Sequence, residues 1–351
     1  MLIKFGPVLD VNTEELPFIT DGENPKFNDM LLEDGDVIIA DTAEDEAVGK
    51  ATEIINIGSR KVISGLHTFA CRPLVKMTPT YLGFYINSET FHKQLYSIMQ
   101  GVKVLSISKS NIGNTAICFP QQSEQYKICT LLNLIETRIN KERHIIDLLK
   151  KYKRGLSESI FSTLSCPTQE LSDVCNIVGG GTPDTGILEY WNGDISWFTP
   201  TEVGKKKYVT SSSRKITKEG LCKSSAKILP PDTVLLTTRA TLGEMSLTTA
   251  TCCTNQGFQS LVAKKDVVLP EYLYYLQTII KPWCEKYSSG NTFREISKKA
   301  LGKCTIPVPS IMKQKYIVDC LSLIDSKIEK SESVLENLLR LKSALLQQLY
   351  I

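Results

Sequence analysis

The chain has 351 residues, of which 42% are hydrophobic, and a formal net charge of +3. This length and apolar content suffice for more than one buried core and exclude a fully disordered protein. No apolar run approaches the roughly 18 residues that cross a bilayer, and the first residues do not have the layout of a signal peptide, so a cytoplasmic protein without a membrane partner is expected.

The cysteines and the distribution of charge limit the kinds of binding site that the chain can contain. The 11 cysteines are scattered without a C-x-x-C pair and the chain has only 3 histidines, so reduced thiols are expected and a zinc site is not. Basic residues are concentrated between Lys205 and Lys227, where Glu219 is the single acid, whereas acidic residues predominate in residues 1–60. The second half is therefore better suited to bind phosphate than the first.

The chain contains an internal repeat. Gly101 with Ile107-Ser108-Lys109 recurs as Gly290 with Ile296-Ser297-Lys298, at a constant offset of 189 residues, and the same offset relates Gln125 to Gln314. Further upstream, with small length differences, residues 36–39 match residues 232–235 and residues 79–82 match residues 270–273. Each repeat is therefore predicted to be a globular unit followed by a helix.

In chain order, residues 1–122 are predicted to form a first domain and residues 123–163 a long central helix. Residues 164–311 would form a second domain and residues 312–351 a C-terminal long helix. In the second domain, residues 232–238 and 259–263 have the composition of strands, Pro270 to Trp283 that of a helix with proline in its first turn, and Gly179 to Pro183 that of a tight loop. The predicted fold class is α+β, with two pseudo-symmetric mixed α/β domains.

The two long segments have a coiled-coil pattern. Apolar residues recur at alternating steps of four and three, and both patterns are interrupted by a polar residue, Glu142 in one and Ser331 in the other, which would fix the register. Each helix would be about 55 Å long. An ordinary long core helix is the alternative, but two copies in matched phase favour an antiparallel pair that holds the domains apart. The series are Ile128, Leu132, Ile135, Ile139, Ile146, Leu149, Leu156 and Ile160, and Ile317, Leu321, Ile324, Ile328, Leu335, Leu338, Leu345 and Leu349.

The sequence contains no complete catalytic motif. Residues 24–27, Asn-Pro-Lys-Phe, resemble an amino-methyltransferase motif but have no second proline and no glycine-rich cofactor loop before them. Gly179 to Gly181 are not followed by the Gly-Lys-Ser/Thr of a phosphate loop, so turn geometry is the better explanation for them. No nuclease-like carboxylate cluster or Ser-His-Asp arrangement is evident. We therefore expect no catalytic residue, no metal site and no cofactor in this chain.

DNA-contacting residues are better supported, because Lys and Arg bind phosphates and Arg, Asn and Gln read base edges. The alternatives are a merely solvated surface for the lysine run and a structural hydrogen-bonding role for Arg239 and for Asn255-Gln256; Trp191, Trp197 and Trp283 are expected to be core residues. The candidates are Thr199, Thr201, Lys205, Lys206, Lys207, Arg214, Lys215, Thr238, Arg239, Thr241, Asn255, Gln256, Ser289, Asn291, Arg294 and Lys298, with Lys103 and Lys109 in the first repeat.

With these motifs in the same order, the chain resembles the specificity subunits of type I restriction-modification enzymes over nearly its whole length. The resemblance rests on segments 35–45, 171–183, 195–200, 238–243, 255–258 and 290–297, arranged around two long helices. It implies two target recognition domains that read the halves of a split site in double-stranded DNA. It also implies two modification subunits that use S-adenosylmethionine to methylate adenine, and restriction subunits that use ATP and magnesium; the chain itself would be non-catalytic.

One departure concerns the first domain. The sequence between Leu171 and Asp232 is longer than the sequence before the matching Asp36, so the first domain is expected to lack an opening strand and the glycine-rich loop, as if shortened at its N-terminus. The alternative function is a decayed coiled-coil subunit that binds the modification subunit without reading a full DNA site. An autonomous nuclease is a third possibility, which would require cleavage by the isolated chain with magnesium alone.

Overall fold

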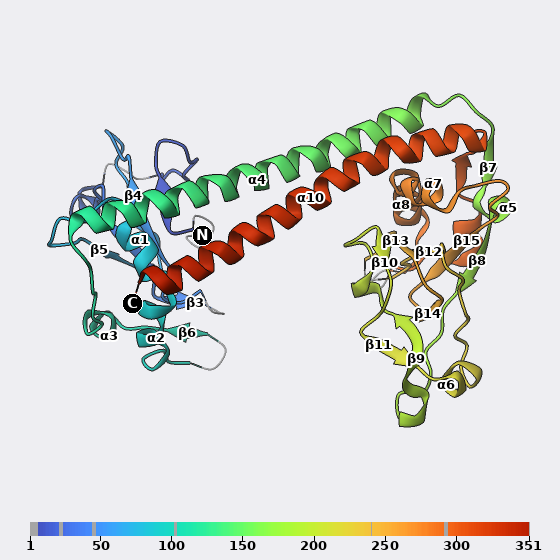
Figure 1. The fold of residues 1–351 in the computed structure, drawn as a ribbon, viewed down its shortest axis with the longest axis horizontal. Coiled ribbons are helices and arrows are strands. Elements are labelled where there is room, and N and C mark those ends of the chain that lie inside the picture. The colour runs from blue at the N-terminus through green and yellow to red at the C-terminus, as the bar shows by residue number, and fades with distance from the viewer. Residues whose placement is uncertain are drawn as a thin grey trace. The chain divides into compact units, whose positions relative to one another are not determined.

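The computed structural model describes residues 6–20, 24–43, 47–101, 104–239, 241–290 and 294–350. The chain divides into two compact units (Figure 1). Unit 1 comprises residues 1–145 and 331–351, and unit 2 comprises residues 146–330, so that each of the two long helices contributes to both units. Among the described residues, no helix is both long enough and apolar enough to span a bilayer.

Unit 1 is built on a four-stranded sheet in the order β1-β4-β2-β5. Strand β1 (Val8–Asp10) pairs parallel with β4 (Ala51–Ile55), and β2 (Val37–Ala40) pairs antiparallel with both β4 and β5 (Thr68–Cys71). Alternate residues of β2 face two different apolar clusters, as the two-residue period of a strand requires. The remaining elements are η2 (Pro25–Met30), β3 (Thr42–Ala43), β6 (Leu105–Ser106), α1 (Tyr81–Ile86), α2 (Glu89–Tyr96) and α3 (Lys109–Gly113).

Unit 2 is built on a five-stranded sheet in the order β10-β13-β12-β15-β8. Its strands are β8 (Cys175–Gly179), β10 (Tyr208–Val209), β12 (Val234–Leu236), β13 (Met245–Thr248) and β15 (Gln259–Ala263). A second sheet joins β9 (Trp191–Phe198), β11 (Arg214–Ile216) and β14 (Cys252–Thr254), and β7 (Thr168–Glu170) pairs with β16 (Thr305–Pro307). The helical elements are α5 (Leu171–Val174), η3 (Leu188–Tyr190), η4 (Pro200–Glu202), α6 (Lys218–Cys222), α7 (Pro270–Tyr275), α8 (Gln277–Tyr287) and α9 (Lys298–Gly302).

The two units repeat one sheet topology. In unit 2, β10 pairs parallel with β13, and β12 pairs antiparallel with β13 and β15, which is the arrangement of β1, β4, β2 and β5 in unit 1. Helix α3 begins at Lys109 and α9 at Lys298, at the offset of the sequence repeat. Strand β8 and the three-stranded sheet have no counterpart among the described residues of unit 1. The repeat thus predicted the sheet topology that the two units share.

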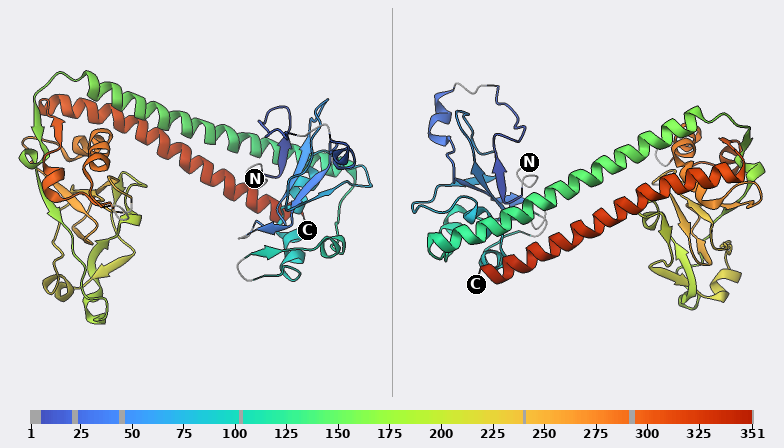
Figure 2. Two further views of the ribbon diagram at one scale, coloured as in Figure 1. Left: turned by 180° about the vertical axis from the view of Figure 1, so that it is seen from behind. Right: turned by 45° about the horizontal axis from the view of Figure 1, so that its top comes forward.

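The two predicted long helices are α4 (Gln122–Thr163) and α10 (Ile311–Leu349), and they lie side by side in every view (Figures 1 and 2). In unit 1, Ile128 and Leu132 of α4 join a core that Leu345 and Leu349 of α10 cover. In unit 2 the seam residues of α10, Ile317, Leu321, Ile324 and Ile328, are all buried, with Leu149, Leu156 and Ile160 of α4 packed against the same core. Glu142, the polar residue in the seam of α4, is buried as well.

A buried glutamine connects each long helix to its globular unit. Gln314 accepts a hydrogen bond at Oε1 from the backbone N of Leu269 and donates from Nε2 to the carbonyl of Pro309. Gln125, at the repeat-equivalent position, accepts from the backbone N of Thr78 and donates to the carbonyl of Pro120. The duplicated glutamine therefore has a duplicated structural role, the pairing of buried backbone groups where the helix begins.

Two ion pairs between α4 and α10 are also related by the repeat. In unit 1, Lys342 Nζ of α10 lies 2.6 Å from Glu136 Oε2 of α4. In unit 2, Lys153 Nζ of α4 lies 2.5 Å from Asp325 Oδ1 of α10. Adding the offset of 189 to Glu136 and Lys153 gives Asp325 and Lys342, so each acid of one repeat binds the lysine of the other. This exchange requires the two helices to run antiparallel, as predicted.

One predicted helix differs from the structure. The segment from Pro270 to Trp283 forms two helices, α7 and α8, separated at Leu276. The backbone N of Leu276 donates to the carbonyls of both Tyr272 and Leu273, a tightened turn of the kind that ends helices. The apolar pattern continues through the break because Tyr272, Tyr275, Leu276 and Ile280 all enter one core, so the break left no sign in the sequence pattern.

Candidate nucleic-acid interface

The three-stranded sheet of unit 2 has a small aromatic core of its own. Trp191 and Trp197 are buried with their rings edge to face, 5.1 Å apart between centroids, which confirms that both are core residues. The guanidinium of Arg214 lies 3.7 Å from the ring centroid of Trp191 and 5.1 Å from that of Trp197, although the residue is exposed. A cation above a tryptophan face is attracted by the ring's electrons. Arg214 is thus held in place at the surface, beside the exposed Lys215.

The glycine loop after β8 is bound to the loop after β14. The backbone N of Gly181 donates to the carbonyl of Thr254 (2.9 Å), and Trp197 Nε1 donates to the carbonyl of Gly181 (2.8 Å). A Cβ on Gly180 would lie 1.9 Å from the carbonyl oxygen of Asn255, and one on Gly181 would lie 2.3 Å from the backbone N of Ala226. The glycines are therefore needed for close backbone approach, which agrees with their interpretation as a structural loop.

Candidate residues from two further loops meet at the same place. The backbone N of Asn255 donates to the carbonyl of Phe198 (3.0 Å), and the side chains of Thr182 and Gln256 are hydrogen-bonded. Asn255 Oδ1 accepts from the backbone N of Gly257 (2.9 Å), which is the structural role considered for it, whereas Gln256 is exposed. We call the loops 180–183, 199–202 and 254–257 the loop cluster.

Thr199 and Glu202 shape the next loop. The backbone N and the hydroxyl of Thr199 each donate to Glu202 Oε2 at 2.8 Å, and Glu202 Oε1 accepts from the backbone N and the hydroxyl of Ser213. Burial alone would raise the pKa of Glu202, but these hydrogen bonds outweigh it and hold the pKa below its ordinary value. The hydroxyl of Thr199 is therefore engaged in a hydrogen bond within the fold, whereas Thr201, two residues later, is exposed.

The stretch from Thr238 to Thr241 is divided between interior and surface. Thr238 has an exposed fraction of 0% and its backbone N donates to the carbonyl of Gly257, so its assignment as a DNA contact is wrong because the residue is buried. Arg239 is half-exposed and forms an ion pair with Glu295, Nη2 to Oε2 at 2.9 Å. Thr241 is exposed. Arg239 thus connects this stretch to the loop that contains Ser289.

That neighbouring loop closes between Ser289 and Glu295, whose backbones exchange two hydrogen bonds of 2.9 Å. Ser289 and Arg294 are exposed, and the guanidinium of Arg294 donates to the carbonyl of Glu285. Two candidates, Asn291 of this loop and Lys103 of the first repeat, lie outside the described residues. Lys298 and its counterpart Lys109 are both exposed at the first position of α9 and α3.

The lysine run contains a second correction. Lys205 and Lys206 are exposed, but Lys207 has an exposed fraction of 8% and its Nζ donates to the hydroxyl of Tyr275 (2.9 Å). That hydroxyl donates to Asp325 Oδ2 (2.6 Å), the acid that also binds Lys153. Burial lowers the pKa of Lys207. Lys207 is therefore not a phosphate contact but joins the strand β10 to the two long helices within unit 2.

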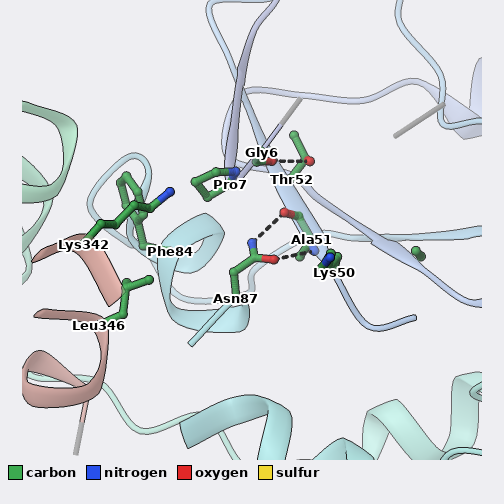
Figure 3. Close-up of a pocket in the computed structure, with 10 residues that line it drawn as sticks. Gly6, Pro7, Lys50, Ala51, Thr52, Phe84, Asn87, Lys342 and Leu346 are labelled. Atoms are coloured by element: carbon green, nitrogen blue, oxygen red, sulfur yellow. Dashed lines mark hydrogen bonds between the residues drawn. The ribbon is translucent and has the colours of Figure 1, made fainter. Parts of the chain in front are cut away.

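Unit 1 has a cavity at the position that corresponds to the Lys207–Tyr275 hydrogen bond of unit 2. The carbonyl of Pro7 accepts from Glu53 N as the carbonyl of Lys207 accepts from Leu247 N, so Pro7 stands in the place of Lys207. Phe84 corresponds to Tyr275 in the repeat, and Lys342 Nζ lies 5.9 Å from the centroid of its ring. Pro7, Phe84, Lys342 and Leu346 line a cavity of about 310 Å³ (Figure 3). Unit 1 thus has the acid–lysine pair between the helices without the buried lysine and tyrosine hydroxyl.

Sequence reasoning missed three exposed lysines, Lys227, Lys299 and Lys303, which line one groove together with Lys298. Lys299 follows the repeated Ile-Ser-Lys motif directly, Lys303 lies four residues further on, and Lys227 is the last lysine of the basic run. No sequence pattern indicates that these lysines lie together. No group of His, Cys, Asp or Glu side chains within the described part of the chain could hold a metal ion.

Comparison with known proteins finds similarity to one family. A family model described as the type I restriction modification DNA specificity domain matches residues 167–339. The type I restriction enzyme MjaIX specificity subunit of Methanocaldococcus jannaschii is 37% identical over 177 residues, which cover 48% of this chain and 41% of that subunit. The putative MjaX specificity subunit of the same organism is 22% identical over 374 residues, covering 99% of this chain and 82% of that subunit.

Solved structures agree in fold. The S subunit of a type I restriction-modification system from M. genitalium has a TM-score of 0.57 at 15% identity, with 92% of this chain and 84% of that chain covered. A chain from a study of type I system assembly and conformational transition has a TM-score of 0.58 at 20% identity, covering 91% of this chain and 82% of that one. The second half of the chain is thus similar to the DNA specificity domain of type I restriction-modification systems, and the chain as a whole is similar in fold to the S subunits of these systems.

Proposed function

We propose that this chain is the DNA-recognition subunit of a type I restriction-modification system, and that its two units read the two halves of a split site in double-stranded DNA. The observation that carries the proposal is the repeat itself: one sheet topology occurs twice, and each copy continues into one of two antiparallel helices. A protein that reads one continuous site would not need a second copy of the fold at the end of a paired helix.

The contact surface that we assign in unit 2 consists of the exposed residues on and around the loop cluster. Thr201, Lys205, Lys206, Lys215, Thr241 and Gln256 are exposed, and Arg214 and Arg239 are held at the surface by tryptophan rings and by Glu295. Restrained side chains lose less conformational entropy when they bind a base or a phosphate. In unit 1, Lys109 is the exposed candidate among the described residues.

The partners follow from the family. We propose that two modification subunits bind this chain, use S-adenosylmethionine and methylate adenine, and that restriction subunits use ATP and magnesium to translocate and cut DNA in the cytoplasm. The chain itself would supply recognition and no catalytic group.

Two substitutions separate base reading from phosphate binding. In a complex of the chain with its modification subunits, Arg239→Ala is expected to relax the preference at one half-site by about 1–3 kcal/mol, whereas Lys206→Ala weakens binding to all sequences alike. Selection from random DNA followed by affinity measurements tests both. Glu295→Gln is the control, because it removes the ion pair and keeps the arginine. If Glu295→Gln and Arg239→Ala have the same effect, Arg239 serves only the loop structure.

The same selection tests the proposed function. Wild-type complex is expected to enrich a two-part consensus with a fixed gap. Enrichment of no consensus, with salt-sensitive affinity for any sequence, would mean that the chain binds its partners without reading DNA.

A further inference from the structure

A basic groove runs along the edge strand of the main sheet of unit 2. Its volume is about 680 Å³, and it is lined by β8 from Cys175 to Val178, by α9, and by Glu170, Ser172 and Lys227. Among the strands of the described residues, β8 is an edge strand whose one neighbour is β15. Four lysines line the groove against a single acid, Glu170. The lysines are Lys227, Lys298, Lys299 and Lys303.

These lysines are available to a ligand. All four are exposed, and none of them takes part in the ion pairs found between described residues, whereas Lys153, Lys265 and Lys281 in the same unit each bind an acid. Like charges grouped around a concave surface raise the local positive potential and attract an anion. A groove of about 680 Å³ lined by four lysines suits a polyanion better than a single small ion.

The groove lies beside the loop cluster. Lys227 follows Ala226, whose backbone N is in such close contact with Gly181 that a Cβ could not be accommodated there. Gly181 is in turn bound to Thr254 and lies next to Thr182, the partner of Gln256. The groove is therefore lined by α9, β8 and Lys227, and Lys227 is one residue from the contact with the loops to which we assign base reading. This position beside the loop cluster favours DNA as the occupant.

We propose that this groove binds consecutive phosphates of the DNA backbone that leaves the half-site read by unit 2. The inference rests on the proposed function and adds the path of the DNA beside the loop cluster. Phosphate contacts fix the position of a reading head without carrying sequence information. The groove would thus supply phosphate contacts. Lys207 is buried and does not supply one.

The test compares two triple variants of equal charge in the complex with modification subunits. Lys298→Gln, Lys299→Gln and Lys303→Gln remove three groove lysines; Lys286→Gln, Lys313→Gln and Lys315→Gln remove three exposed lysines of unit 2 outside the groove lining. DNA affinity is measured over a series of salt concentrations. Each lost phosphate contact reduces the slope of log K against log salt by about 0.9. We expect the groove variant to have the shallower slope and an unchanged consensus, and the control to match the wild type.

The possible results distinguish this inference from the proposed function. A variant with Lys→Arg at the three groove positions keeps the charge and is expected to have the salt slope of the wild type. Recovery of the slope with arginine would show that the glutamine variant lost charge at these positions and did not merely unfold. An equal slope in the groove variant and the control would overturn the groove as a DNA site. Loss of the modification subunit by the groove variant, with its salt slope unchanged, would also overturn it and assign the groove to a protein partner. If the wild-type complex enriches no two-part consensus, the proposed function itself fails.

Discussion

Replacing Asp325 by alanine is expected to destabilise unit 2 by about 3 kcal/mol, roughly a hundredfold in its opening equilibrium. Asp325 and Lys153 have exposed fractions of 13% and 24%, and the same carboxylate accepts from Tyr275, which holds Lys207. Its loss leaves a mostly buried lysine and a buried hydroxyl without their acceptor, and buried charges without a partner are costly. Hydrogen exchange read peptide by peptide should show the loss in β10, α7 and the flanking parts of both long helices.

Matched variants make this result specific. Asp319→Ala removes an exposed acid from the same helix and should change exchange little. Glu136→Ala in unit 1 breaks the equivalent pair with Lys342, but no tyrosine hydroxyl depends on it, so a smaller loss confined to unit 1 is expected. Equal losses for Asp325→Ala and Glu136→Ala would show that the link through Tyr275 and Lys207 contributes nothing.

Replacing Gln314 by leucine is expected to cost unit 2 about 3–5 kcal/mol. Its side chain is fully buried, and it pairs the backbone N of Leu269 and the carbonyls of Val267 and Pro309, all at 2.9 Å. A leucine would leave three buried backbone groups unpaired, each at about 1–3 kcal/mol before relaxation. Thermal or denaturant unfolding of the variant, with exchange at Leu269, measures the effect.

Gln125→Leu is the internal comparison. It has an exposed fraction of 2% and pairs two backbone groups, those of Thr78 and Pro120, so its loss should be smaller and confined to unit 1. Gln347→Leu, at an exposed position of α10, is the control for a leucine at the helix surface. Stability close to that of the wild type in Gln314→Leu would mean that the helix start is held by apolar packing alone.

Much of the architecture was predictable because the sequence contains an internal repeat. The constant offset identified Gln125 with Gln314, and the seams of α4 and α10 followed from apolar spacing, since both depend on short-range periodicity. The strand β15 lies at the residues predicted, Gln259 to Ala263, because turn residues bound an apolar run on both sides.

The site was less predictable because its geometry depends on distant residues. Lys207 resembles its neighbours Lys205 and Lys206, and its burial is decided by Tyr275 and Asp325, far along the chain. Thr238 likewise ends the segment predicted as a strand and is a candidate DNA contact by its residue type, but its backbone N pairs with the carbonyl of Gly257 and the residue is fully buried. The groove lysines come from two distant segments, one at Lys227 and one from Lys298 to Lys303, that no local pattern connects. A single sequence fixes such pairings only through the fold.

The most direct test of the central claim is a map of methylated adenines in the genome of a host that expresses this chain with its modification subunits. The account predicts one asymmetric motif made of two specified parts separated by a fixed unspecified gap, and Arg239→Ala should alter one part and leave the other unchanged. A motif without a gap, or a modification pattern that persists after this chain is deleted, would contradict the claim that its two units read one split site.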